Sequence, residues 1–214
     1  KDLLEGEPYE APLAPFGGIE QLAWSPDSKI VAYTSKKKTG REYAESTNSD
    51  IYFYNLESGE VKNMTEGMMG YDINPTFSPD GTMLAWQSME RDGYEADKNR
   101  LFVMNLATGE KTDLTENFDN NCDTYIWGED NSTIYMVSSV NGTSQIYSVT
   151  LATKEIKALT EGKHNYLSIA LGADGIIASR QSMSQPTEIY SVNLNTGEST
   201  NITEENKHIL DQLQ

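Results

Sequence analysis

The feature that most constrains the fold of this chain is an internal repeat of about 45 residues. An apolar run ending in leucine, a turn and a short run that closes on threonine occurs four times. The leucines are Leu56, Leu106, Leu151 and Leu194, which are spaced 50, 45 and 43 residues apart. Four short strands fit this length, and a unit of this size cannot bury both of its faces alone. The chain is therefore expected to stack repeated units.

A second signature alternates with the first and has the chemistry of a hairpin turn. It reads Trp-Ser-Pro-Asp-Ser at residues 24–28 and Phe-Ser-Pro-Asp-Gly at residues 77–81, with weaker copies at 126–131 and 170–175. Proline presets φ, aspartate can accept a hydrogen bond from the backbone ahead, and glycine tolerates positive φ. Asn131 replaces the glycine at one turn and can adopt the left-handed region.

The third repeat is the least regular. Lys154 stands where the leucine signature elsewhere has glycine, and a positive φ there costs about 1–2 kcal/mol.

Short runs rich in β-branched and aromatic residues lie between the turns, and no helical periodicity is found before the C-terminal tail. These patterns predict an all-β chain, a β-propeller made of four four-stranded antiparallel blades. The blades are expected at residues 19–67, 71–116, 123–162 and 166–204.

The first residues predict one strand more than the four blades need. Residues 2–7 match residues 55–60, which places residue 1 at the end of a third strand and a fourth strand at 8–13. Residues 1–18 then belong to a preceding blade, and the chain forms part of a seven- or eight-bladed propeller. The alternative is a self-contained four-bladed propeller with an extra strand. Because unpaired blade edges are normally covered, self-association through the open ends is expected.

Charge excludes some partners. There are 33 acidic against 16 basic residues, a net charge of −17, which would repel nucleic acid and anionic membranes. The simplest reading is a surface that keeps an all-β protein soluble. No apolar run is long enough to span a bilayer, and the single Cys122 leaves the compartment open.

The Trp/Phe-Ser-Pro-Asp-Gly and Asn-Leu-x-Thr-Gly-Glu…Leu-Thr-Glu signatures resemble the repeats of TolB-like propellers and of the prolyl oligopeptidase family of serine peptidases. Residues 88–101 are similar to an elongated blade loop in its dipeptidyl and acylaminoacyl peptidase branches. Residues 205–210 resemble their exit towards the hydrolase, which makes 205–214 a linker. The resemblance implies a C-terminal α/β-hydrolase domain with a Ser-Asp-His triad, and a propeller above it that admits only short peptides.

The chain itself is not expected to be an enzyme. It contains no Gly-x-Ser-x-Gly, and the nearest string, at residues 142–146, lies on a predicted hairpin. The only histidines, His164 and His208, lack metal ligands at suitable spacing and are read as surface or packing residues. No catalytic residue, metal or cofactor is predicted.

Two long loops are the predicted binding site. Residues 36–49 and 89–100 interrupt successive blades between the second and third strands, which places both loops on one face. A carboxylate there could hold a peptide's N-terminal ammonium, and an arginine a carbonyl or carboxylate. The candidate residues are Arg41, Glu42, Arg91, Asp92, Tyr94 and Glu95.

Two functions remain open at this point. The first is a gating and substrate-binding domain of a serine exopeptidase. The second is a TolB-like protein-binding scaffold without enzymatic activity. The charged residues of the two loops are also compatible with exposure to solvent alone, or with docking against the hydrolase domain.

Overall fold

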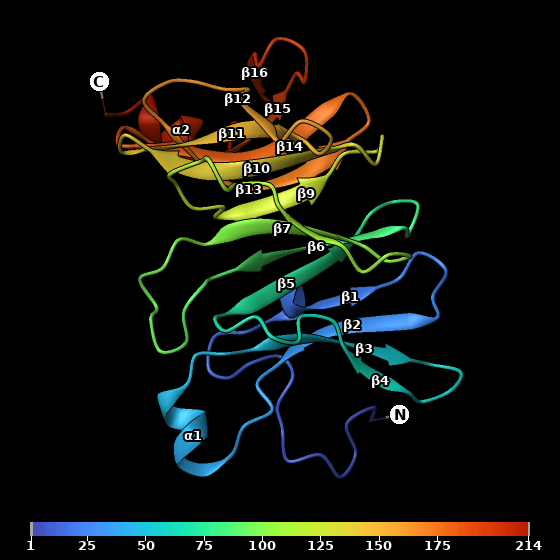
Figure 1. The fold of residues 1–214 in the computed structure, drawn as a ribbon. Helices are drawn as coiled ribbons and strands as arrows, with labels where there is room; N and C mark the ends of the chain where they lie inside the picture. The colour runs from blue at the N-terminus through green and yellow to red at the C-terminus, as the bar shows by residue number, and fades with distance from the viewer. Residues whose placement is uncertain (1, 214) are drawn as a thin grey trace. The chain divides into compact units, whose positions relative to one another are not determined.

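The computed structural model describes residues 2–213 and contains four antiparallel four-stranded sheets, each built from strands that are consecutive in the sequence (Figure 1). The predicted all-β fold with four blades is confirmed. The chain divides into two compact units, one ending at Asp119 and the other beginning at Asn120, and each unit contains two blades. Residues 1 and 214, at the ends of the expected preceding blade and linker, lie outside the described residues.

The first unit holds blades 1 and 2. Blade 1 consists of β1 (Leu22–Trp24), β2 (Ile30–Ser35), β3 (Asp50–Asn55) and β4 (Val61–Asn63). Blade 2 consists of β5 (Asp72–Phe77), β6 (Met83–Ser88), β7 (Arg100–Asn105) and β8 (Lys111–Asp113). A 3₁₀ turn, η1 (Ile19–Gln21), leads into β1, and a short helix, α1 (Gly40–Glu45), lies between β2 and β3.

The second unit holds blades 3 and 4. Blade 3 consists of β9 (Thr124–Trp127), β10 (Thr133–Val140), β11 (Thr143–Thr150) and β12 (Glu155–Ala158). Blade 4 consists of β13 (Asn165–Gly172), β14 (Gly175–Ser182), β15 (Gln185–Val192) and β16 (Ser199–Asn201), and helix α2 (Lys207–Leu210) follows it.

Each unit has its core between its two blades, because alternate side chains of a strand point to opposite faces of the sheet. In the first unit, Ala32, Ile51 and Phe53 of blade 1 cluster with blade 2. The blade 2 members are Leu84, Trp86 and Met104. In the second unit, Val137 and Ile146 of blade 3 pack with blade 4, whose members are Tyr166, Ile176, Ala178 and Val192.

The turn chemistry agrees with the sequence. Asp80 accepts a 3.0 Å hydrogen bond from the backbone N–H of Thr82, and Gly81 has φ +72°. Asn131 and Lys154, the two replacements for glycine, both have φ +55°. Lys154 therefore holds the strained conformation predicted for it.

The conserved spacing between the leucine and threonine of each repeat has a structural role that sequence analysis did not identify. The closing threonine accepts a hydrogen bond from the backbone N–H of the apolar residue near the start of the third strand, at 2.9–3.0 Å in all four blades. The pairs are Ile51 with Thr65, Leu101 with Thr115, Ile146 with Thr160 and Ile189 with Thr203. Each blade thus ties the end of its fourth strand to its third.

The structure shows no strand at residues 8–13, where the sequence predicts an extra one, and the assignment of residues 1–18 to a preceding blade stays a prediction. The described residues before η1 form turns and bends without a strand. Pro8 and Pro12 lack the N–H that a ladder requires, and the backbone N–H of Leu13 donates to Oε1 of Gln21 at 2.7 Å. The segment packs Leu3, Leu4 and Ala11 on blade 1.

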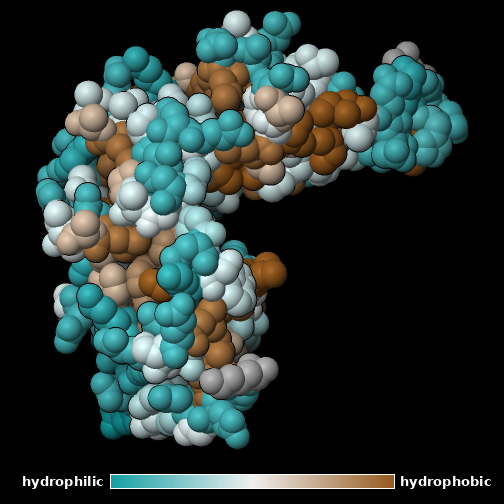
Figure 2. Space-filling model, turned by 90° about the vertical axis from the view of Figure 1, so that its right-hand side faces the viewer, coloured by the Kyte–Doolittle hydropathy of each residue, from teal (hydrophilic) through white to brown (hydrophobic). Residues whose placement is uncertain are grey.

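The surface of both units combines apolar and hydrophilic side chains. Figure 2 shows apolar side chains gathered in patches among hydrophilic ones on the face it presents. No helix within residues 2–213 is both long and apolar enough to cross a membrane.

Candidate functional site

The two long loops lie where the sequence placed them, after the second strands of blades 1 and 2. The first loop, residues 36–49, joins β2 to β3, and the second loop, residues 89–99, joins β6 to β7. Figure 1 shows α1 and the second loop on the same side of the first unit. The helix in the first loop was not predicted, because a helix of six residues is too short to show an apolar period.

The two loops meet at a shared junction between the blades. Ser49 and Tyr71 form an isolated parallel bridge, in which the N–H of Asp72 donates to the carbonyl of Ser49 at 3.1 Å. The N–H of Met89 donates to the carbonyl of Tyr71 at 2.8 Å. The end of the first loop and the start of the second are therefore held side by side by backbone hydrogen bonds.

Asp92 fastens the two loops to one another. Its Oδ1 accepts hydrogen bonds from the hydroxyl of Ser46 at 2.7 Å and the backbone N–H of Thr47 at 2.8 Å. A longer bond, 3.2 Å, comes from the N–H of Asn48, and the N–H of Gly93 donates back to Oγ1 of Thr47 at 2.9 Å. These donors, that of Ser46 first, hold the pKa of Asp92 below its usual value. Asp92 acts as a clip between loops.

Lys36 stabilises the first loop by hydrogen bonds to its backbone. Its ammonium donates to the carbonyls of Tyr43 at 2.8 Å and Ser46 at 3.0 Å, and lies 3.9 Å from the centre of the Tyr43 ring. Burial lowers the pKa of Lys36. The Lys36 ammonium thus holds the segment around α1 through two backbone carbonyls and the Tyr43 ring.

Arg91 and Tyr94 form a stacked pair within the second loop. The Arg91 guanidinium lies 3.8 Å from the centre of the Tyr94 ring and also binds both carboxylate oxygens of Asp97. The backbone N–H of Arg91 donates to the same carboxylate at 2.8 Å, and the hydrogen bonds from Arg91 lower the pKa of Asp97. Arg91 therefore has its charge neutralised inside its own loop.

Arg41 and Glu42 are the most open of the candidates. Arg41 pairs with Glu45 at 2.6 Å and Lys38 with Glu42 at 3.1 Å, each one helical turn apart. The side chains of Arg41 and Glu42 are 87% and 69% exposed, so these ion pairs are weak and exchange readily with water.

The candidates fall into three groups. A shallow depression of about 500 Å³ is lined by Lys38, Arg41, Glu42, Glu45, Ser46 and Asp92. Arg91 and Tyr94 form their own stack, and Glu95 accepts a 3.3 Å hydrogen bond from the hydroxyl of Tyr71. The structure brings together Arg41, Glu42 and Asp92, and leaves the other three outside the depression.

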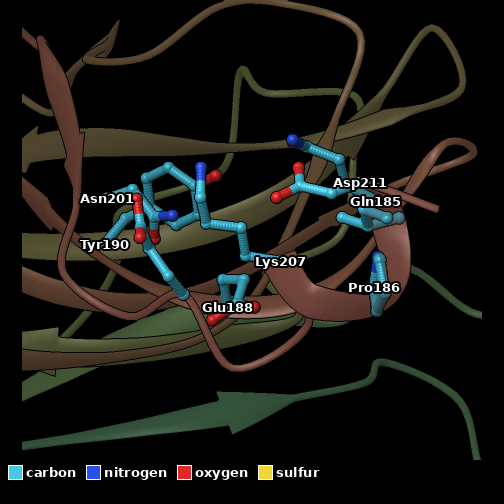
Figure 3. A pocket seen from close by; sticks show the side chains of 9 residues that line it. Gln185, Pro186, Glu188, Tyr190, Asn201, Lys207 and Asp211 are labelled. Atoms are coloured by element: carbon cyan, nitrogen blue, oxygen red, sulfur yellow. The ribbon is translucent and has the colours of Figure 1, made fainter. Parts of the chain in front are cut away.

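The second unit contains a smaller pocket, of about 260 Å³, that the sequence did not indicate (Figure 3). It lies between β15, β16 and α2, and Lys207 extends from α2 towards Tyr190 and Asn201. The Arg180 guanidinium lies 3.4 Å from the centre of the Tyr190 ring. The pocket therefore combines cationic, acidic and aromatic groups.

Glu188 in this pocket holds the closing segment against blade 4. It accepts hydrogen bonds from the backbone N–H and the side-chain amide of Asn206, both at 2.9 Å, and from the hydroxyl of Thr203. These bonds, that of Thr203 first, lower the pKa of Glu188 to about 2. The sequence signal was available, because Asp50 and Gln145 stand at the same repeat position and accept from their own closing threonines.

The two histidines lie in different segments of the second unit. His164 packs edge-on against Tyr166, with ring centres 5.2 Å apart, and burial, followed by the charge of Arg180, lowers its pKa. His208 lies on α2. No group of three or more His, Cys, Asp or Glu that could hold a metal ion occurs in the part of the chain that the structure describes.

Comparison with known proteins places the fold in a family. The family model for the TolB beta propeller domain matches residues 19–209. The chain belongs to this family. The four blades described above lie within the matched range.

Relatives of this TolB-type propeller include dipeptidyl-peptidase 5 of Porphyromonas gingivalis, which is 49% identical over 213 residues. The match covers 100% of the chain but 31% of that relative, so the chain spans about a third of its length. The relative is a peptidase by name, and the longer part of its sequence lies outside the match.

Solved structures show the same fold at lower identity. Acylaminoacyl peptidase of Pyrococcus horikoshii matches 90% of the chain and 28% of its own, with a TM-score of 0.70 and 18% identity. TolB of Acinetobacter baumannii matches 86% of the chain and 43% of its own, with a TM-score of 0.61 and 23% identity. The propeller architecture is thus shared by a peptidase and by TolB.

Proposed function

We propose that this chain is a noncatalytic propeller segment of a serine exopeptidase of the dipeptidyl or acylaminoacyl type, which restricts access to the active site and contacts the substrate. The observation that carries the proposal is the 49% identity to dipeptidyl-peptidase 5 along the whole chain. An α/β-hydrolase domain of a longer polypeptide would supply the catalytic groups.

The first unit supports a gating role because its two loops are fastened together. Asp92 and the backbone bonds at Ser49 tie two neighbouring blades at the level of the loops. A pair of loops held in this way forms a rigid rim on a rigid scaffold, and a rigid rim excludes folded proteins by size while short peptides pass.

The substrate contacts are assigned to the depression on the first loop. Glu42 would hold the N-terminal ammonium of a peptide, and Arg41 a carbonyl or carboxylate oxygen. Both side chains are exposed and can exchange their ion-pair partners for a ligand. Asp92 positions the loop rather than binding substrate, and Arg91, Tyr94 and Glu95 extend the rim.

The test uses the longer polypeptide with a dipeptidyl substrate. Glu42→Gln and Arg41→Ala are each expected to lower kcat/KM about tenfold, mainly through KM, the equivalent of about 1.4 kcal/mol. Glu155→Gln is the control, because Glu155 is an exposed carboxylate of blade 3 that pairs with Lys157 at 3.1 Å. Unchanged kinetics in both loop variants would remove the substrate contacts from the proposal.

The second candidate is a TolB-like scaffold that binds proteins and performs no chemistry, which the structural similarity to TolB favours. A longer polypeptide that lacks peptidase activity on every dipeptidyl and acylaminoacyl substrate would support this candidate and overturn the first.

A further inference from the structure

A carboxyl group is buried at the junction where the two loops meet. Asp72 is the first residue of β5, and its backbone N–H donates to the carbonyl of Ser49 at 3.1 Å and to the Ser49 hydroxyl at 3.2 Å. The N–H of Met89 donates to the carbonyl of Tyr71 at 2.8 Å. Ser49 ends the first loop and Met89 begins the second. We call Ser49, Tyr71, Asp72 and Met89 the loop junction.

The side chain of Asp72 is closed off from solvent. It is 0% exposed, and its Oδ1 accepts the 3.0 Å hydrogen bond of the Trp86 indole. Its Oδ2 is also buried and has no hydrogen-bond partner among residues 2–213. Buried carboxylates are normally paired with a cation or saturated with hydrogen bonds, because an isolated buried charge is costly. An ionised Asp72 would lack this compensation, whereas a protonated Asp72 is neutral.

The groups nearest to Asp72 do not supply the missing positive charge. Asp50 of β3 accepts a 3.1 Å hydrogen bond from the hydroxyl of Thr65, and its charge opposes the ionisation of Asp72. Arg100 of β7 donates to the carbonyl of Ser88 at 3.3 Å and to its hydroxyl at 3.5 Å. The guanidinium is therefore engaged by Ser88.

The other elements packed on β5 bring no cation to the junction. Neither β1 nor β6 contains a titratable side chain. Tyr33 of β2 stacks on Tyr52 of β3, and burial raises the pKa of both. Glu20 of η1 accepts a hydrogen bond from the N–H of Gly18 at 2.7 Å. The charged side chains of the loops bind within the loop pair, as seen for Lys36, Arg91 and Asp92.

The same position of the repeat holds an uncharged residue in blade 4. Asp72 pairs with Ser88 across a strand irregularity, and Tyr166 pairs with Arg180 in the matching register. Tyr166 is 1% exposed and belongs to the core between blades 3 and 4. A tyrosine ring at this position adds apolar packing, whereas a carboxyl group adds little and costs free energy to bury. Blade 2 thus has a titratable group where blade 4 has a core contact.

We propose that Asp72 is a pH-sensitive switch, which closes the loop junction while its carboxyl group is protonated and opens it when the proton leaves to solvent. The ionised side chain needs water, and Asp72 reaches water when the start of β5 separates from Ser49. That separation breaks the hydrogen bonds of the loop junction. Asp92 keeps its bonds to the first loop, so the loops stay joined beyond the junction.

The switch acts near neutral pH. Burial raises the pKa of Asp72 to about 7. Since the folded value lies above the unfolded value of 3.8, the closed junction is favoured at low pH and is lost as the pH rises through about 7. A rim made of the two loops would be tight in acid and loosened above neutral pH.

Amide hydrogen exchange on the chain, measured by NMR between pH 6 and pH 8.5, tests the proposal. Protection factors at Ser49, Asp72 and Met89 are expected to fall by up to about tenfold per pH unit above pH 7. The amide of Thr47, which Asp92 holds, should keep its protection. The amide of Leu101, bonded to the closing threonine of blade 2, reports unfolding of the blade and should stay more strongly protected than the three junction amides.

Asp72→Asn has nearly the same shape and cannot ionise, so its junction amides should show protection that is independent of pH. Glu57→Gln is the matched control, because it removes an exposed carboxylate from a turn of blade 1 and should keep the wild-type pH dependence. Circular dichroism shows whether the variants are folded. If Asp72→Asn unfolds, Asp50→Asn replaces it, and removal of the Asp50 charge should move the midpoint to lower pH.

Four results overturn the proposal: junction protection in the wild-type chain that does not change with pH, an Asp72→Asn variant that keeps the wild-type pH dependence, junction amides that exchange at the rate of Leu101 throughout, and an unmoved midpoint in Asp50→Asn. The proposal does not rest on the proposed peptidase function, because the exchange is measured without a substrate.

Discussion

The indole Nε1 of Trp86 donates a 3.0 Å hydrogen bond to Oδ1 of Asp72, and both side chains are completely buried in the first unit. Asp72 lies at the junction of blades 1 and 2, where the two loops meet. Burial raises the pKa of Asp72 to about 7, although hydrogen bonds from Ser88 and Trp86 act in the opposite direction. The charge of Asp50 also raises the pKa of Asp72.

The stability of the first unit should therefore fall as the pH rises towards 7. A raised pKa in the folded state contributes stability that is fully present below the unfolded value of 3.8 and is lost as the pH rises through about 7. The slope from one such group is at most about 1.4 kcal/mol per pH unit. Asp72→Asn keeps an acceptor for Trp86 and removes the titration. Urea unfolding monitored by tryptophan fluorescence should show a flatter pH dependence and a more stable variant at pH 8.

Glu57→Gln is the control for this experiment, because Glu57 is an exposed carboxylate on a turn of blade 1. A wild-type chain whose stability is flat between pH 4 and 8 would contradict the assignment of Asp72.

The hydrogen bonds by which Asp92 links the two loops give the second prediction. Asp92→Ala removes the acceptor of Ser46, Thr47 and Asn48, and should cost about 1–2 kcal/mol locally. Hydrogen exchange should accelerate at the amides of Thr47, Asn48 and Gly93 and stay unchanged in β2 and β6. Because the pKa of Asp92 is lowered, the contribution is present at neutral pH and is lost when the carboxylate becomes protonated at low pH. Glu57→Ala, an exposed carboxylate on another turn of blade 1, is expected to leave the same amides protected.

Much of the fold could be read from the sequence because turns and strand alternation are local properties. The positive φ of Lys154 and Asn131 followed from their places in the repeat, without any tertiary information. The strand expected at residues 8–13 is not formed within the described residues, for the converse reason. A strand exists only with a partner, and the match of residues 2–7 to 55–60 said nothing about what lay beside it.

The candidate site was predictable only in outline. The matching positions of residues 36–49 and 89–100, between the second and third strands of successive blades, indicated that the two loops would share a face, and the bonds of Asp92 show that they touch. The partners of each charge depend on side-chain geometry that no spacing reveals. Arg91 was a candidate substrate-binding residue in the sequence, but it binds Asp97 six residues further along its own loop.

Lys154 gives the third prediction. Three of the four leucine signatures have glycine at this position, with φ between +72° and +75°, and Lys154 holds φ +55°. Lys154→Gly should stabilise the second unit by about 1 kcal/mol, because glycine adopts this conformation without a clash of its Cβ. The reverse change, Gly109→Lys, meets no atom within 4 Å, so backbone strain alone should destabilise the first unit by a similar amount. Thermal unfolding of both variants measures the two shifts, and shifts of the same sign would contradict the strain argument.

The anchor of the closing segment gives the last prediction. Glu188→Ala removes the acceptor for Thr203 and for both donors of Asn206, so residues 204–210 should detach from β15 and the pocket beside Lys207 should open. Limited proteolysis should then cut within α2, while blade 4 remains resistant. Glu188→Gln keeps one acceptor oxygen and should protect the segment partly. Since the pKa of Glu188 is lowered to about 2, the wild-type anchor is complete above the ordinary pKa of 4.5 and is lost as the pH falls through about 2. Cleavage that is equally fast in wild-type chain and Glu188→Ala at neutral pH would show that other contacts hold the segment.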